Sequence, residues 1–148
     1  MKTVVLAISF FCAWPAQAGD AKSWDLKSAA AYLDGRMNWW ASWPSAARDH
    51  GTFCVSCHTS LPYALARPAL RSALAEHGPS TDERTFLDNI SKRVALWQEV
   101  EPFYSDAKNG APKSAESRGT EAVLNALVLA RYEEPAAVDA LRNMWRCK

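Results

Sequence analysis

Two thiols and an imidazole lie within five consecutive positions, in the sequence Cys54-Val55-Ser56-Cys57-His58. Thiols separated by two residues can each add to one of the two vinyl groups of a haem, and a histidine that follows directly places its imidazole beneath the iron. This C-x-x-C-H spacing is typical of c-type haem attachment. It predicts one covalent haem c, held through Cys54 and Cys57, with His58 as a ligand of the haem iron.

Three other kinds of site share part of this pattern. A thioredoxin-like redox pair needs a strand before the first cysteine and a βαβ setting, which the helical pattern of this sequence does not suggest. A zinc site needs four ligands, usually in matched pairs, whereas Cys147, His50 and His77 are scattered along the chain. A disulfide within the motif stays open for an exported protein, but it leaves the adjacent histidine without a role. The motif therefore favours haem.

The second axial ligand of such an iron could come from four residues, which are Met144, Met37, His77 and His50. Met37 lies on an apolar helix face, where core packing is the usual role. The two histidines lie at the edges of loops, where solvation is more common than ligation. Met144 is the first choice for the sixth ligand, because it follows the motif and lies near the C-terminus, as in many c-type cytochromes.

The N-terminus has the three parts of a secretion signal. Lys2 supplies a positive start, residues 4–14 form an apolar run, and Ala16-Gln17-Ala18 is a small-x-small cleavage site. The run is too short to span a bilayer, so no transmembrane segment is expected after cleavage. The sequence thus predicts a signal peptide over residues 1–18 and a single helical haem domain over 19–148, located in the periplasm or otherwise exported.

Composition indicates an ordinary folded domain. The chain has 148 residues, of which 49% are hydrophobic and 22% are charged, so a packed core is expected rather than disorder. It has 17 basic and 16 acidic residues, and loss of Lys2 with the signal would leave the mature chain formally neutral. No basic stripe is present, which argues against nucleic acid as a partner.

Apolar residues recur at helical spacing through most of the mature chain, which predicts an all-α fold of about five helices. Asp25 is a possible N-cap, and the capping box of Ser80 and Glu83 precedes an apolar stripe. A long polar loop is expected over residues 105–119, and no strand pattern is visible. The expected helices are 26–42, about 62–77 with Pro68 inside it, one from Ser80 through Trp97, 120–131 and 136–145.

Three longer sequence segments resemble a family of exported bacterial haem-motif proteins that are similar to squalene and terpenoid cyclases. These are Gly51 to Thr59, Leu61 to Pro68 and Ser117 to Ala126. The resemblance spans roughly residues 25–145 and implies a partial α/α-toroid of helical repeats, as an alternative to a cytochrome-c-like arrangement. It does not imply cyclase activity, because the chain has no Asp-rich acid motif of the cyclase kind.

These observations favour an electron-transfer protein, either a carrier or an accessory subunit of an oxidoreductase, rather than an enzyme. No acid, base or nucleophile forms a second catalytic constellation with the motif. A haem-containing enzyme acting on an apolar substrate and a haem-based sensor remain alternatives. The expected partner is a redox protein, and a chain too short for a complete toroid could also associate with itself.

Overall fold

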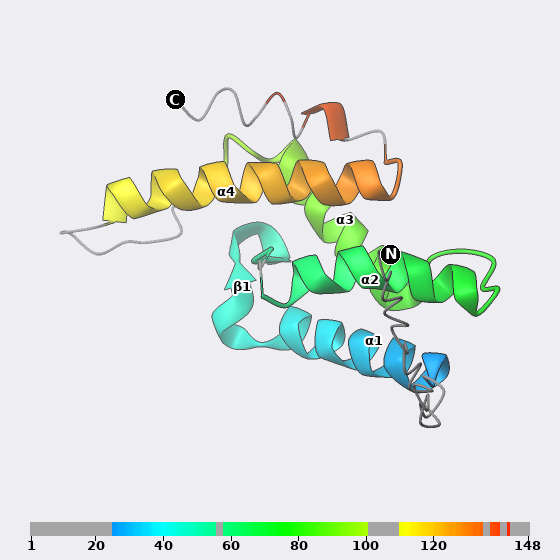
Figure 1. Ribbon diagram of the computed structural model, residues 1–148. Coiled ribbons are helices and arrows are strands. Elements are labelled where there is room, and N and C mark those ends of the chain that lie inside the picture. Colours follow the sequence, from blue (N-terminus) through cyan, green and yellow to red (C-terminus); the bar gives the residue numbers. More distant parts are fainter. Residues whose placement is uncertain (1–24, 56–57, 101–109, 135–136, 140–141, 143–148) are drawn as a thin grey trace, which may run out of the picture.

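The computed structural model describes residues 25–55, 58–100, 110–134, 137–139 and 142, and most of them are helical (Figure 1). The predicted all-α fold class is therefore confirmed, and residues 137–139 and 142 add to the four long helices to give the expected number of about five. The signal peptide predicted over residues 1–18 lies outside the described residues. The long helices are α1 (Leu26–Ser42), α2 (Ser60–Ala73), α3 (Thr81–Ala95) and α4 (Gly110–Arg131).

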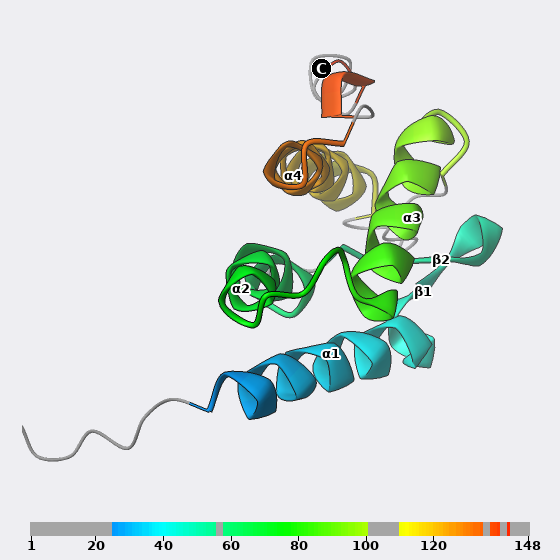
Figure 2. The ribbon, with the colours of Figure 1, turned by 90° about the vertical axis from the view of Figure 1, so that its right-hand side faces the viewer.

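Three of these helices lie one above another, with α2 between α1 and α4, and α3 runs across the side of all three (Figure 2). Every long helix contributes buried apolar side chains to the main core, among them Met37, Tyr63, Phe86, Ile90 and Val128. The predicted apolar stripe is also buried, at Leu87, Ile90 and Val94 of α3 and at Trp97 just beyond its end. Within the described residues, no helix combines the length and apolar character needed to cross a membrane.

Side chains cap the N-termini of α1 and α3 as the sequence predicts. The Asp25 carboxylate accepts a hydrogen bond from the backbone N–H of Ser28 at 3.0 Å. At α3, the Ser80 hydroxyl accepts from the N–H of Glu83 at 3.1 Å, and the Glu83 carboxylate accepts from the N–H of Ser80 at 2.7 Å. Each cap pairs backbone donors that the first helical turn leaves without a partner. Both helix starts are thus fixed locally.

The second helix ends earlier than the sequence predicts. It was expected to continue to His77, but α2 ends at Ala73 and passes through Pro68 without a break. Ala75 has a left-handed backbone with φ of 55°, and the N–H of Glu76 bonds back to the carbonyl of Arg71 at 3.0 Å. This turn places the Glu76 side chain beside α2, where it forms a tertiary ion pair that sequence patterns do not reveal.

The long loop expected from Ser105 is wrong from Gly110 onward, because α4 begins there. Pro112 is the third residue of the helix, a position whose N–H would have no partner within the helix anyway. Further along, the Arg118 guanidinium donates to the carbonyl of Trp97 at 2.6 Å and lies 4.9 Å from the centre of its ring. Tertiary contacts therefore stabilise a helix in a segment whose composition is typical of loops.

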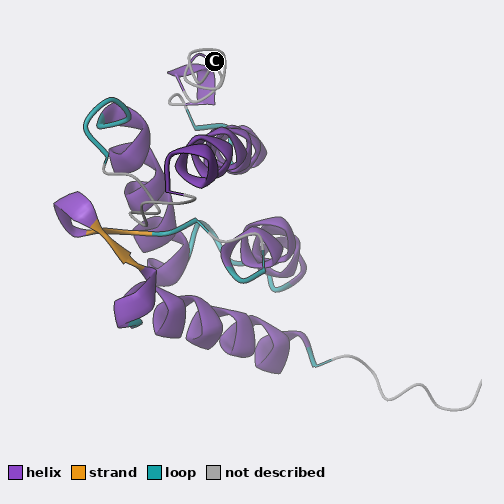
Figure 3. Ribbon diagram, turned by 90° about the vertical axis from the view of Figure 1, so that its left-hand side faces the viewer, coloured by secondary structure: helices purple, strands orange, loops and turns teal. Residues whose placement is uncertain are grey.

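A small hairpin between α1 and α2 is a second departure from the predicted structure, since no strand was expected (Figure 3). The antiparallel register pairs Ala47 with Phe53, and two-residue strands are too short to leave an alternating pattern in the sequence. The turn uses left-handed backbone at His50 and Gly51, with φ of 55° and 64°. The segment consists of η1 (Pro44–Ala46), β1 (Ala47–Arg48), η2 (Asp49–Gly51) and β2 (Thr52–Phe53).

Candidate functional site

The first cysteine of the motif lies directly after β2 and is fixed through its backbone. The N–H of Cys54 donates to the carbonyl of Ala46 at 2.8 Å, and its own carbonyl accepts from Trp40 Nε1 at 2.7 Å. The N–H of the preceding residue, Phe53, donates to Asn89 Oδ1 at 2.8 Å, and its carbonyl accepts from Asn89 Nδ2 at 3.1 Å. All four backbone polar groups of these two residues are paired, so the helices set the position of Cys54.

The Cys54 side chain is a free thiol and is partly buried. Burial raises the pKa of this thiol above its ordinary value, and the positive charge of the nearby Arg48 only partly opposes the shift. The attacking cysteine of a thioredoxin-like pair needs a lowered pKa, because the thiolate is the nucleophile. The environment of Cys54 has the opposite effect on the pKa of its thiol.

The histidine of the motif lies in the turn that leads into α2. His58 is exposed, whereas Ser60, two residues later, is fully buried and begins the helix. Cys57, the second predicted attachment residue, lies outside the described residues together with Ser56. The structure thus places Cys54 and His58 at the two ends of one short connection between β2 and α2.

Three of the four candidates for a sixth iron ligand fall within the described residues. Met37 is 2% exposed and packs in the main core, which confirms the packing role expected for it. His50 and His77 are both exposed, and His50 lies 3.6 Å from the carboxylate of Asp49. Met144, the first choice from the sequence, lies outside the described residues. His50 belongs to η2 of the hairpin, and His77 lies beyond the end of α2.

A buried ion pair behind β2 was missed by the sequence analysis. Arg93 on α3 is fully buried and binds the Glu121 carboxylate on α4 through Nε and through Nη2, the latter at 3.1 Å. Its Nη1 also donates to the Thr52 hydroxyl at 2.7 Å, which ties both helices to the hairpin. In the sequence, the signal for this pair is that Arg93 directly precedes Val94, a residue of the apolar stripe of α3. Both charges are close enough to Cys54 to act on its thiol.

Three tryptophans form an aromatic cluster beside the motif. Trp39 and Trp43 stack with ring centres 5.3 Å apart, and Trp40 lies 5.4 Å from Trp43. Trp40 is partly buried and carries the hydrogen bond to Cys54, while Trp39 and Trp43 are 43% and 39% exposed. The Arg36 guanidinium covers one face of Trp39 at 4.3 Å. The cluster thus contains an inner ring that contacts the motif and an exposed pair that does not pack fully into the core.

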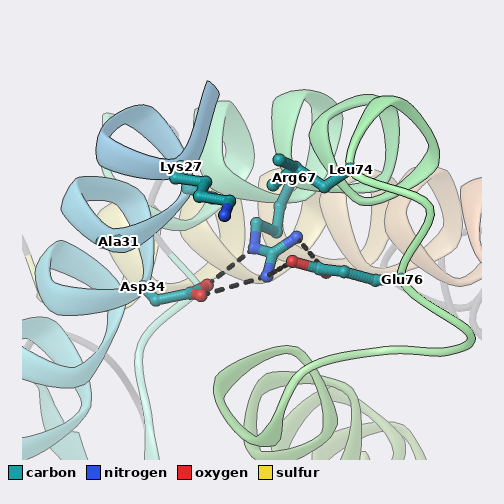
Figure 4. Close-up of a pocket in the computed structure, with 7 residues that line it drawn as sticks. Lys27, Ala31, Asp34, Arg67, Leu74 and Glu76 are labelled. Atoms are coloured by element: carbon teal, nitrogen blue, oxygen red, sulfur yellow. Dashed lines mark hydrogen bonds and ion pairs between the residues drawn. The ribbon is translucent and has the colours of Figure 1, made fainter. Parts of the chain in front are cut away.

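A separate pocket lies between α1 and the end of α2, where charged side chains already pair with one another (Figure 4). Arg67, whose side chain is 3% exposed, binds Asp34 at 2.9 Å and Glu76 at 2.8 Å. Lys27 lines the same pocket, whose volume is about 400 Å³. None of its lining residues belongs to the motif. Its charges serve the packing of α1 on α2, and we assign it no chemistry.

Comparisons with protein-family models, with curated proteins and with solved structures find no match for this chain. Within the described residues, no group of three or more histidine, cysteine, aspartate or glutamate side chains could hold a metal ion by itself. The chemistry of the motif and of the residues around it therefore carries the functional proposal.

Proposed function

We propose that this chain is an exported c-type haem protein whose role is electron transfer. Cys54 and Cys57 would carry one haem through thioether bonds, and His58 would bind its iron from the proximal side. When bound, the haem would supply an iron that takes up and releases one electron. We propose a redox protein as the partner and the periplasm, or another exported location, as the place of action.

The observation that carries the proposal is the C-x-x-C-H spacing of Cys54, Cys57 and His58, with a partly accessible first thiol in a mainly helical protein. Burial raises the pKa of the Cys54 thiol, whereas a thiol–disulfide oxidoreductase needs a lowered pKa at its attacking cysteine. The exposed imidazole of His58 is accessible to an iron from outside the helical core. The motif, the raised pKa at Cys54 and the exposed His58 therefore support a haem over a redox dithiol.

The surroundings of the motif also suit a bulky apolar group. Trp39 and Trp43 leave large aromatic surface exposed next to Trp40, which binds the carbonyl of Cys54. Such rings provide a flat apolar surface of the kind that shields a porphyrin from water. Arg36 lies over Trp39 and would offer a positive charge to a propionate. We propose that this cluster borders the haem.

Co-expression with a haem-maturation system tests the central claim. The wild-type band on a denaturing gel should stain for haem, and the Cys54→Ala, Cys57→Ala double variant should not. Cys147→Ala is the matched control and should keep its stain. The intact mass should equal that of residues 19–148 plus one haem, which also tests cleavage after Ala18. A wild-type chain that carries no haem after maturation overturns the proposal.

The spectrum of the reduced protein separates electron transfer from the alternatives. A sharp low-spin α-band is expected for a six-coordinate electron carrier. A high-spin spectrum that shifts with carbon monoxide would instead favour the haem enzyme or the sensor. We propose Met144 as the sixth ligand, so Met144→Ala should abolish the near-infrared thioether band of the oxidised protein and leave the haem attached. Met37→Ala is the control and should leave that band in place, because Met37 packs in the core.

A further inference from the structure

The peptide groups that lead into the motif are held by a single side chain of α3. Phe53 is paired with Ala47 in the hairpin register, but both its N–H and its carbonyl bond to Asn89. The primary amide supplies one acceptor and one donor, which is what a neighbouring strand would offer. Asn89 is 7% exposed, so water has little access to replace these bonds.

The next peptide group is held from α1 and from η1. Trp40 Nε1 donates to the Cys54 carbonyl at 2.7 Å, and the Ala46 carbonyl accepts from the Cys54 N–H at 2.8 Å. One helical turn beyond Asn89, Arg93 holds the side chain of Thr52. Three consecutive residues before and at the first cysteine are thus fixed from three elements that are themselves part of the core.

We propose that Asn89 is a positioning residue, whose amide sets the register of β2 and so presents the Cys54 thiol for thioether formation. The inference rests on the proposed function. A slip of β2 by one residue would turn the side chain of Cys54 to the opposite face of the strand. Asn89 opposes this slip, because a shift by one residue turns the N–H and carbonyl of Phe53 away from its buried amide and leaves those groups without these partners.

The reaction that depends on this positioning is an addition. The S–H bond of Cys54 and the π bond of a haem vinyl group are replaced by a C–S bond and a C–H bond. The thiol proton ends on the terminal vinyl carbon, and neither an oxidant nor a leaving group is involved. Because nothing else is exchanged, the yield at Cys54 depends on how the thiol is held relative to the vinyl group.

The experiment compares Asn89→Ala with Ile90→Ala after co-expression with the maturation system. Haem-bearing chains are denatured and alkylated, and peptide mass spectrometry measures the fraction in which Cys54 is still a free thiol. Asn89→Ala should raise this fraction on the order of tenfold, the ratio that one hydrogen bond of ordinary strength supports. Ile90 is a fully buried neighbour on α3, so Ile90→Ala tests destabilisation alone and should lower yield without raising the fraction.

Two milder variants test the same inference if Asn89→Ala does not fold. Trp40→Phe removes only the N–H that binds the Cys54 carbonyl and should raise the free Cys54 fraction in the same direction. Trp39→Phe is its control, because Trp39 belongs to the same aromatic cluster without bonding to Cys54. Unchanged fractions in Asn89→Ala and Trp40→Phe, with haem present in the wild type, overturn the inference alone. A wild type without haem overturns the proposed function itself.

Discussion

The side chain of Arg93 is fully buried, and a substitution of it or of its ion-pair partner is expected to destabilise the protein strongly. Its guanidinium binds Glu121 and Thr52 and lies 3.9 Å from the Asp49 carboxylate, so the hairpin and α4 both depend on it. A buried pair of charges is costly to form, since each ion loses its hydration. Removing one partner is more costly still, because the other charge stays buried without compensation.

Glu121→Gln should therefore lower the free energy of unfolding by about 3 kcal/mol, measured from the midpoint of urea denaturation. Arg142→Ala is the control, since Arg142 and Asp139 form an exposed pair with side chains 68% and 64% accessible. Arg142→Ala should change the free energy of unfolding by no more than about 0.5 kcal/mol. A loss for Glu121→Gln no larger than the control's would mean that the buried pair does not form in solution.

The thiol of Cys54 gives a prediction about pH. Because burial raises its pKa in the folded chain, the neutral form is favoured on folding, and the associated stability is present below the unfolded pKa, near 9.0. It is lost as the pH rises through the folded pKa. In the mature chain with Cys57→Ser and Cys147→Ser, Cys54 should alkylate with a pH midpoint higher in buffer than in denaturant. A lower midpoint in buffer would instead indicate an activated thiolate.

Among the helices and strands, the first half of α4 is the segment whose structure the local sequence predicts least well, because a loop was expected there. Gly119 lies within the helix, and a Cβ added there would meet nothing within 4 Å. Gly119→Ala should therefore stabilise the protein by about 0.5–1 kcal/mol, seen as a higher urea midpoint. Gly51→Ala is the contrasting variant and should destabilise, because Gly51 has φ of 64°. A loss of stability in Gly119→Ala would contradict a helix at this position.

The ends of α3 and α2 show which helix boundaries a local sequence pattern can predict. The start of α3 was predicted correctly because its capping box acts within four residues, from Ser80 to Glu83. The end of α2 was predicted at His77, because the stop signals Gly78 and Pro79 follow it. The helix instead ends at Ala73, and the chain turns at Ala75. Stop signals mark where a helix cannot continue, and tertiary contacts decide whether it ends before that point.

At the scale of the whole molecule, a connected set of polar contacts joins all the long helices. Arg67 on α2 binds Asp34 on α1, and the Ser80 hydroxyl at the start of α3 donates to the same carboxylate at 3.5 Å. The N–H of Ser80 and the hydroxyl of Tyr132, just after α4, both donate to Glu83. Because these groups are largely buried, they fix how the helices meet as well as how strongly they associate.

A double-mutant cycle with Asp34→Asn and Arg67→Gln measures the coupling across the contact between α1 and α2. The interaction free energy should be about 1 kcal/mol or more, because the Arg67 side chain is only 3% exposed. The matched cycle on the exposed Arg142 and Asp139 should give nearly zero. Additive effects of Asp34→Asn and Arg67→Gln would show that this ion pair does not couple α1 to α2.

The sequence by itself determined what depends on neighbours along the chain. The spacing within Cys54-Val55-Ser56-Cys57-His58, the cap at Asp25 and the apolar stripe of α3 all act over one or two helical turns, so they can be recognised without a fold. Asn89 and Phe53 are 36 positions apart, and Arg93 and Glu121 are 28 apart. Only the tertiary structure decided these pairs, because the residue that satisfies a buried polar group is chosen by helix packing and leaves no local pattern.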